Sequence, residues 1–183
     1  MSIPTDVIRV ADGCQLQLTI HLCLLKYLRN RDLGSDAMTK DLSAGSDAAH
    51  QLIATLAKRC PDLEIVPSEH SAGELGWNIP VQQGLTTELW LSFSNNDEMH
   101  FSLENFRISF FPCTDSIEGE KFVDAVSGFI DGTYQIIEHY RGSRCVRADL
   151  QKPNGDEWET IASSSRLHWP LPYRKTFKTI KNG

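Results

Sequence analysis

The stretch ELWLSFSNNDEMHFSLENFRISFFPC, residues 88–113, decides the fold because apolar and polar residues alternate through most of it. Such alternation is typical of half-buried β-strands. The apolar residues of its first part all have odd numbers: Leu89, Leu91, Phe93, Met99, Phe101 and Leu103. Because cross-strand partners share a face, the loop between the two runs must hold an odd number of residues. We predict a hairpin with a three- or five-residue loop near Asn96, in which Asn95 or Asn96 adopts the left-handed conformation.

After Leu103 the alternation changes phase, and the next apolar residues are even-numbered: Phe106, Ile108 and Phe110. A slip of one residue would turn every side chain to the opposite face of the sheet. A β-bulge or a tight turn at Glu104-Asn105 must therefore absorb the shift, and we favour a tight turn or bend.

The loop sequence SNNDEMH, residues 94–100, gathers possible metal ligands: Asn95, Asp97, Glu98 and His100. An EF-hand calcium loop needs a glycine at its sixth position and a distal glutamate, and this stretch has neither. A transition metal prefers at least two nitrogen or sulfur ligands close together, whereas the cluster offers one imidazole. We interpret the cluster as a turn, and we expect no metal site and no cofactor.

The polar residues of this stretch share the other face of the predicted sheet. They are Glu88, Trp90, Ser92, His100, Ser102 and Glu104, with Arg107 and Ser109 beyond the phase shift. A tryptophan ringed by polar groups is a common anchor at protein interfaces. We predict a partner-binding surface formed by Trp90, Asp97, Glu98, His100, Glu104 and Arg107. The alternative is that another segment of the chain covers Trp90.

Two helices are predicted before this stretch. The first spans about residues 14–32, and a strand over residues 14–22 followed by a short helix is the alternative, because the apolar residues there alternate. The second helix begins near Ser46, whose side chain can cap it, and it stops before Pro61. The sequence DLEIV after Pro61 predicts a short strand.

A third helix is predicted over about residues 118–141, where apolar residues recur three and four positions apart. Gly142 follows at the position where a glycine commonly ends a helix. Gly128 and Gly132 lie one turn apart inside it, and each costs about 1 kcal/mol of helix propensity relative to alanine. Close approach to a sheet would explain these glycines, and a kink is the alternative.

The sequence RCVRADLQKPNGDEWETIA, residues 144–162, predicts a closing hairpin. Asn154-Gly155 suits the two positive-φ positions of a type I′ turn. Strands that follow one another without intervening helices pair antiparallel. The predicted fold class is α+β: an antiparallel sheet with a meander and a closing hairpin, helices packed on one face, and one long helix before the last hairpin. We expect a single domain over residues 1–183.

The composition is that of an ordinary soluble domain. Of the 183 residues, 40% are hydrophobic and 23% are charged, and the apolar run near the N-terminus is too short and too polar to cross a membrane. The five cysteines are widely spaced without a CxxC pair, which disfavours structural zinc and predicts free thiols in a reducing compartment. The N-terminus does not resemble a signal peptide, so we expect a cytoplasmic protein.

Charge is distributed unevenly along the chain. The net charge is −6, yet residues 166–183 form a tail with five basic and no acidic residues, which leaves −11 on the rest. An acidic body disfavours nucleic acid, except through this basic tail, and suits a basic protein partner. We predict that the tail docks on its own acidic body, rather than binding nucleic acid, through apolar anchors: Trp169, Tyr173, Phe177 and Ile180. The alternative is a free tail that acts as a nucleic-acid-binding arm.

No sequence motif points to catalysis. The chain contains no phosphate-binding glycine loop, no nucleophile elbow and no HExxH pair. In size, acidity and α+β order it resembles small bacterial immunity proteins, which implies a protein-binding module that neutralises a basic partner. The alternative is a small enzyme or small-molecule binder with a pocket between the sheet and the long helix. Gly128 and Gly132 would then leave room for a ligand, and proton transfer would fall to one of three residues: His100, His139 or Glu104.

Overall fold

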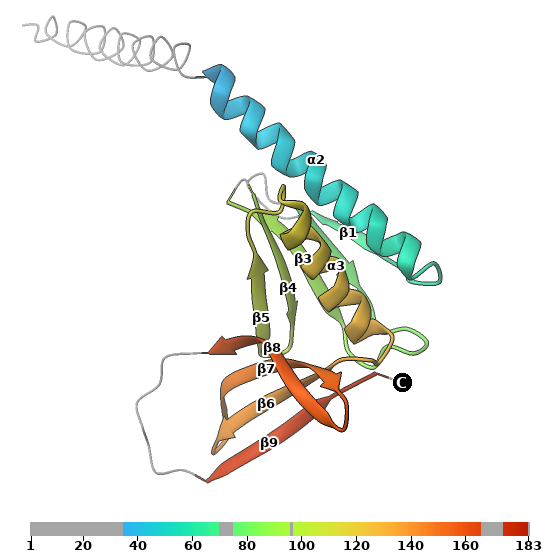
Figure 1. The fold of residues 1–183 in the computed structure, drawn as a ribbon, viewed down its shortest axis with the longest axis vertical. Coiled ribbons are helices and arrows are strands. Elements are labelled where there is room, and N and C mark those ends of the chain that lie inside the picture. Colours follow the sequence, from blue (N-terminus) through green and yellow to red (C-terminus); the bar gives the residue numbers. More distant parts are fainter. Residues whose placement is uncertain (1–34, 70–74, 96, 166–173, 183) are drawn as a thin grey trace, which may run out of the picture. The chain divides into compact units, whose positions relative to one another are not determined.

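The computed structural model describes residues 35–69, 75–95, 97–165 and 174–182 (Figure 1). Their helices are α2 (Ser35–Arg59) and α3 (Ser116–Ile130). Their strands are β1 (Val66–Glu69), β2 (Leu75–Ile79), β3 (Leu89–Ser94), β4 (Glu98–Leu103), β5 (Phe106–Phe110), β6 (Gln135–Arg141), β7 (Arg144–Asn154), β8 (Glu157–Ser165) and β9 (Lys175–Ile180). The fold class is α+β, as predicted. Two compact units, Met1–Asp41 and Leu42–Gly183, divide the chain, and every contact described below lies within the second.

Strands β1 to β5 form the first sheet as an antiparallel meander in sequence order. Ser94 pairs with Glu98, so the β3–β4 loop has three residues, and Asn95 has a φ of 51°. Leu103 pairs with Phe106, so Glu104-Asn105 is a tight turn, in which Glu104 has a φ of 44°. The odd-length loop, its left-handed asparagine and the tight turn are therefore all confirmed.

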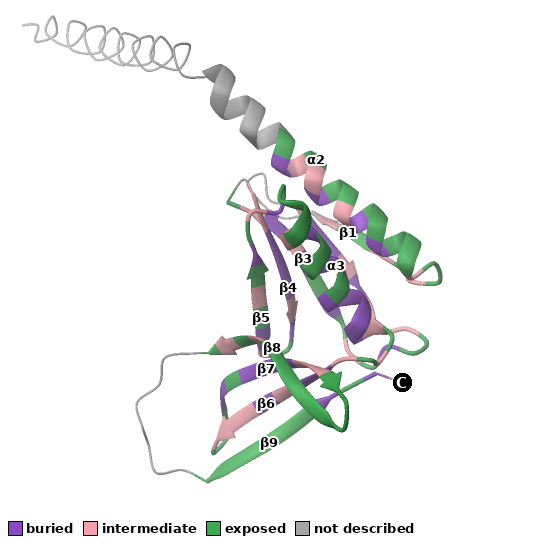
Figure 2. Cartoon of the chain, in the orientation of Figure 1, coloured by how far each residue is buried: buried purple, intermediate pink, exposed green. Residues whose placement is uncertain are grey.

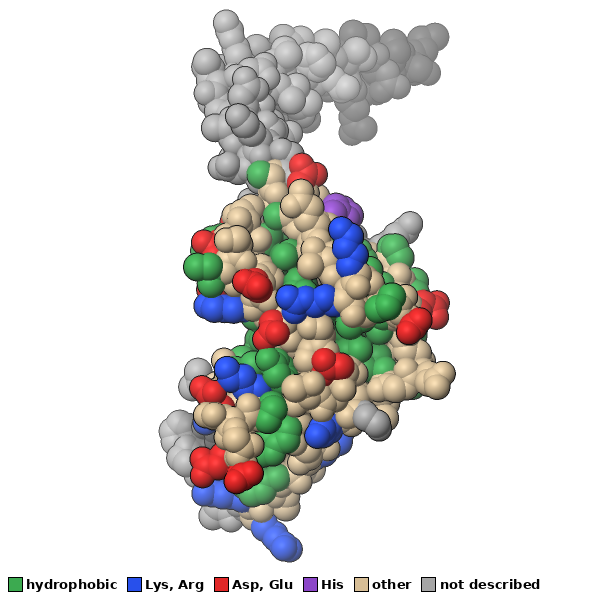
Figure 3. Space-filling model, turned by 45° about the vertical axis from the view of Figure 1, so that its right-hand side comes forward, with side chains coloured by type: hydrophobic (Ala, Val, Ile, Leu, Met, Phe, Trp, Pro, Cys, Tyr) green, Lys and Arg blue, Asp and Glu red, His purple; other side chains and the backbone are tan. Residues whose placement is uncertain are grey.

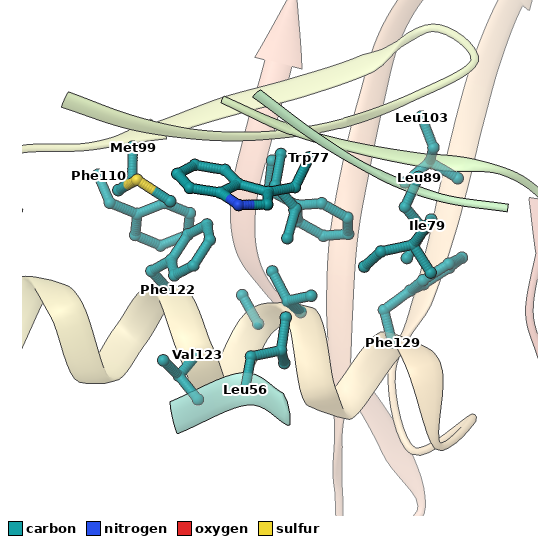
Figure 4. Close-up of a cluster of buried hydrophobic side chains, with 14 of the residues drawn as sticks. Leu56, Trp77, Ile79, Leu89, Met99, Leu103, Phe110, Phe122, Val123 and Phe129 are labelled. Atoms are coloured by element: carbon teal, nitrogen blue, oxygen red, sulfur yellow. The ribbon is translucent and has the colours of Figure 1, made fainter. Parts of the chain in front are cut away.

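Both helices pack on the apolar face of the first sheet, as predicted. The sheet contributes ten buried side chains: Trp77, Ile79, Leu89, Leu91, Phe93, Met99, Phe101, Leu103, Phe106 and Phe110. Helix α3 adds Phe122, Val126 and Phe129 among others, and α2 adds Ala49, Ile53 and Leu56. Figure 4 shows Met99, Phe110 and Ile79 between the strands and α3, with Leu56 of α2 beside Val123. In Figure 2 the buried side of α3 faces the strands.

The long third helix of the prediction is wrong, because its second half is a strand. Asp115 caps α3 by accepting hydrogen bonds from the Ile117 and Glu118 amides at 2.8 and 3.1 Å. The helix ends at Ile130, and Gly132, with a φ of 75°, turns the chain away. Residues 135–141 then form β6, which bonds to β7 on one side and to β9 on the other. This pairing on both edges outweighs the helical spacing of the apolar residues.

Strands β6 to β9 form a second antiparallel sheet in the order β8-β7-β6-β9, where a single sheet was expected. Its inner face adds Ile136, Ala148, Leu150 and Ile180 to the same core. The closing hairpin β7–β8 is confirmed, but its turn is displaced by one residue. Asn154 pairs with Glu157, so the loop is Gly155-Asp156, and only Gly155 has a positive φ, of 63°. A glycine first in a two-residue loop is typical of type II′ rather than type I′.

The predicted boundaries near α2 are also wrong. The helix starts at Ser35 and runs through Ser46, which is therefore an interior residue and not the cap. The polar, loop-like composition of residues 34–46 concealed this extension. The following strand begins only at Val66, so most of DLEIV precedes it. The helix expected over residues 14–32 lies outside the described residues.

The docking of the tail is confirmed for residues 174–182. Strand β9 pairs with β6 along its whole length, and Lys178 contacts the carboxylates of Glu104 and Glu138. Ile180 is buried, as is Asn182, which donates a hydrogen bond to the Phe129 carbonyl at 3.0 Å. Phe177 was expected to be an anchor, but it is 66% exposed. Trp169 and Tyr173 lie outside the described residues.

Two expectations based on composition can be compared with the described part of the chain. Cys60, Cys113 and Cys145 are free thiols there, and Cys14 and Cys23 lie outside it. Neither described helix has the length and the apolar character that crossing a membrane would require.

Candidate functional site

The polar face of the first sheet, opposite the helices, carries Trp90 on its middle strand, β3. Trp90 lies between Asn78 on β2 and Ser102 on β4, and Ser102 in turn pairs with Arg107 on β5. The indole is 39% exposed among these small or polar neighbours. We call this surface, formed by Asn78, Trp90, Glu98, Ser102 and Arg107, the Trp90 face.

His100 belongs to the same face but is buried, with 4% of its surface exposed. Its Nε2 lies 2.6 Å from Ser94 Oγ, and its Nδ1 lies 2.8 Å from Ser109 Oγ. Because hydroxyl groups occupy both ring nitrogens, the ring is fixed within the sheet. Glu98 lies beside it, and hydrogen bonds from Asn95 and Ser109 lower the pKa of this carboxyl. The Trp90 face therefore includes a carboxylate that stays ionised.

Asp97 was predicted to contact a partner protein, but its carboxylate is hydrogen-bonded to other residues of this chain. Its carboxylate accepts hydrogen bonds from Thr114 N at 3.0 Å, Thr114 Oγ1 at 2.9 Å and Cys113 Sγ at 3.1 Å. These bonds fasten the segment between β5 and α3 to the β3–β4 loop. Burial, together with the bond to Asp97, raises the pKa of the Cys113 thiol to about 12. Asp97 thus has a structural role that its position in a loop did not reveal.

Glu104 is likewise engaged away from the Trp90 face. It pairs with Lys178 of β9, and Lys178 also lies 3.9 Å from Glu138 Oε2. Glu138 is fully buried, and it accepts hydrogen bonds from Tyr140 Oη at 2.8 Å and from the Asn105 amide at 3.2 Å. The bond to Glu138 raises the pKa of Tyr140 to about 12. This cluster ties the β4–β5 turn to the second sheet, and no pattern in the sequence predicts it.

His139 lies on the outer face of the second sheet, the face turned away from the core. Its Nε2 is 2.8 Å from Asp149 Oδ2, while Arg147 Nε and Ser163 Oγ each donate to Asp149 Oδ1 at 2.6 Å. Burial of Asp149 opposes its ionisation, but the bonds from Arg147, Ser163 and His139 outweigh burial and lower the pKa. The carboxylate is therefore an ionised hub that fixes three neighbouring side chains.

The three residues of the enzymatic alternative are not brought together. His100 contacts Ser94 and Ser109, whereas Glu104 contacts Lys178. His139 contacts Asp149 and the ring of Phe177. These partners of the three residues, all within the described part of the chain, therefore differ from one another.

A cavity of about 340 Å³ lies between the C-terminal ends of α2 and α3. It is lined by Arg59, Cys60, Asp124, Ser127, Gly128, Asp131, Thr133 and Tyr134. Its lining contains no histidine, and it does not lie between the sheet and the helix as the alternative assumed. Gly128 leaves room for the ring of Tyr134 instead of a ligand: a Cβ at this position would come within 2.7 Å of that ring.

Replacing Gly128 with alanine is expected to lower the free energy of unfolding by about 1–3 kcal/mol, because the added methyl displaces the Tyr134 ring. Displacement also weakens the hydrogen bond from Tyr134 Oη to Asp124 Oδ2, which is 2.7 Å long. The same substitution in a Tyr134→Ala background should be neutral or stabilising, since alanine favours the helix by about 1 kcal/mol over glycine. Urea unfolding of the four chains measures this coupling. The steric explanation would be wrong if Gly128→Ala lowered the free energy of unfolding equally in the presence of Tyr134 and in the Tyr134→Ala background.

Within the described part of the chain, no three His, Cys, Asp or Glu side chains are placed to hold a metal ion together. Comparison of the chain with protein-family models, curated proteins and solved structures gave no match.

Proposed function

We propose that the chain is a protein-binding module that engages a basic protein partner through the Trp90 face, as an immunity-type protein neutralises its target. The observation that carries this proposal is the partly exposed Trp90 among small polar side chains on the polar face of the first sheet. Interface hot spots are enriched in tryptophan and arginine near the centre of the contact, and Arg107 lies two strands away on the same face.

The charge of the surrounding segment supports a basic partner. Residues 35–134, which contain the first sheet and both described helices, hold 16 Asp and Glu residues but only five Lys and Arg residues. An excess of one sign attracts a partner of the opposite sign and accelerates the encounter, and salt weakens this attraction. The arrangement therefore favours rapid, salt-sensitive association.

Trp90→Ala is expected to weaken binding of such a partner by about 30-fold or more, the effect of a hot-spot residue worth at least about 2 kcal/mol. The immobilised chain would be used to isolate a binding protein from cell extract, and the purified protein would then be titrated against both forms. Trp158→Ala, an exposed tryptophan on the second sheet, is the matched control and should leave affinity unchanged.

The association rate should also fall steeply between low and physiological salt. Unfolding curves must show that both variants remain folded. Two results would each refute the proposal: a captured protein that binds Trp90→Ala as tightly as the unchanged chain, or one that carries a net negative charge.

A further inference from the structure

Three cations lie side by side at one end of the outer face of the second sheet. Arg141 on β6 pairs with Arg144 on β7 and with Lys175 on β9, so all three side chains share one face. Adjacent strands are about 4.8 Å apart, which places the Cα atoms of these three residues within roughly 10 Å of one another. Like charges in directly opposite positions destabilise a sheet. A row of three cations across three strands is thus an unfavourable arrangement for folding alone.

The charges of this row are not neutralised within the described part of the chain. The other basic residues of the sheet have partners: Arg147 pairs with Asp149, Lys152 with Glu159, and Lys178 with Glu104. Arg141, Arg144 and Lys175 form no ion pair with any described residue. Their charge is therefore available to an anionic ligand. We call the surface formed by Arg141, Arg144, Lys175 and Phe177 the basic face.

An exposed aromatic ring adjoins the cation row. Phe177 lies two residues after Lys175 on β9, opposite His139, and its ring meets the imidazole edge-on at a centroid distance of 5.1 Å. The Phe177 side chain is the most exposed large hydrophobic group on this sheet, at 66%. A ring held at a fixed angle and open to solvent is a platform for stacking another planar group.

The second sheet also differs in charge from the rest of the chain. Residues 135–183 hold nine Lys and Arg residues against five Asp and Glu residues, the reverse of the acidic segment before them. Two of the five acids, Glu138 and Asp149, are buried. The other three lie at the opposite end of β7 and β8 from the cation row, close to the Gly155 turn. In Figure 3, Lys and Arg side chains appear at the lower end of the molecule, where the second sheet lies.

We propose that the basic face binds single-stranded nucleic acid. Backbone phosphates would contact Arg141, Arg144 and Lys175, and an unpaired base would stack on Phe177. Single-strand binding proteins combine these two features, a positively charged track and aromatic platforms. A duplex keeps its bases stacked inside and cannot use an exposed phenylalanine, whereas an acidic protein segment would need the charges but not the ring. This surface is separate from the Trp90 face, so the two proposals stand or fall independently.

The test is fluorescence anisotropy with labelled oligothymidylate and oligouridylate of about 16 nucleotides. The double variant Arg144→Gln, Lys175→Gln removes two exposed cations. The slope of the logarithm of the association constant against the logarithm of salt concentration should then become shallower by about 1.4, because each lost phosphate contact accounts for about 0.7. Phe177→Ala should weaken binding roughly 5- to 150-fold. The matched charge control is Lys58→Gln with Lys121→Gln, which removes two exposed cations from α2 and α3 and should leave the slope unchanged. Trp90→Ala should leave affinity for the oligonucleotides unchanged.

Three results would overturn this inference. If the oligonucleotides do not bind, or if their affinity does not change with salt, then the three cations do not contact backbone phosphates. Equal binding of oligonucleotide and polyglutamate, with no effect of Phe177→Ala, assigns the face to an acidic protein segment instead. Sedimentation that shows salt-sensitive self-association, lost in the Arg144→Gln, Lys175→Gln variant, assigns it to the acidic part of a second copy.

Discussion

Replacing Glu138 with alanine is expected to lower the free energy of unfolding by about 3–5 kcal/mol, the usual cost of breaking a buried charged cluster. The substitution removes the acceptor for Tyr140 Oη and the Asn105 amide, and it leaves a void where a fully buried side chain was. Lys178 also loses one of its two carboxylate neighbours. Because these groups join the β4–β5 turn to the second sheet, the loss should appear as reduced global stability.

Two further variants make this prediction specific. Glu138→Gln keeps one carbonyl acceptor and should cost less, about 1–3 kcal/mol. Glu157→Ala removes an exposed carboxylate from the same sheet and should change stability by less than about 0.5 kcal/mol. Urea unfolding followed by tryptophan fluorescence compares the three. The prediction fails if Glu138→Ala costs no more than Glu157→Ala.

Phe101→Ala is the second substitution with a large expected effect, a loss of about 3–5 kcal/mol. Phe101 is fully buried, and its ring centroid lies 5.6 Å from that of Phe106 and 6.0 Å from that of Phe129. It therefore connects two strands of the first sheet to helix α3. Truncation removes a large apolar side chain and leaves a cavity that the surrounding rigid elements fill only in part.

Phe177→Ala is the chemically identical control at an exposed site. It should alter the free energy of unfolding by less than about 0.5 kcal/mol, because Phe177 is 66% exposed. Denaturant unfolding of both variants gives the comparison directly. A similar loss for the two substitutions would mean that Phe177 is buried in solution, which would also remove the stacking platform of the basic face.

Strands β3, β4 and β5 of the first sheet could be predicted from sequence in detail because each of them has one apolar and one polar face. Odd numbering on both sides of Asn96 was enough to require an odd loop, and the three-residue loop follows that rule. The change of phase after Leu103 required a turn or bulge, and Glu104-Asn105 forms the turn. Both inferences depend only on residues within the stretch itself.

Strand β6 could not be distinguished from a helix in the same way. Ile137 and Tyr140 continue the three- and four-residue spacing of α3, so the apolar pattern alone extends the helix. Gly132 marks the end of the helix, but a glycine inside an apolar pattern is equally compatible with close packing against a sheet. What settles the conformation is pairing with β7 and with β9, and β9 lies far along the chain. Local periodicity contains no information about such partners.

In the candidate site, too, local pattern predicts some features, whereas contacts with distant parts of the chain determine others. The placement of Trp90 on the polar face follows from its position in a strand that alternates between faces, and this placement was predicted. Asp97 and Glu104 were assigned to a partner surface, but the structure pairs them with Thr114 and Lys178. Glu138 was overlooked as a buried carboxylate because it was placed in a helix near polar neighbours. Contacts between side chains distant in sequence decided these three cases.

The position of β9 beside β6 has a consequence for synthesis of the chain. As the polypeptide leaves the ribosome, β6 can pair at once with β7, but its other edge stays open until β9 follows. At 5–20 residues per second this interval lasts roughly 2–7 s. An unpaired edge offers its amides and carbonyls to any other extended chain. The nascent protein therefore passes through a period in which this edge is open to pairing with other chains, and a product truncated before β9 would keep that edge open.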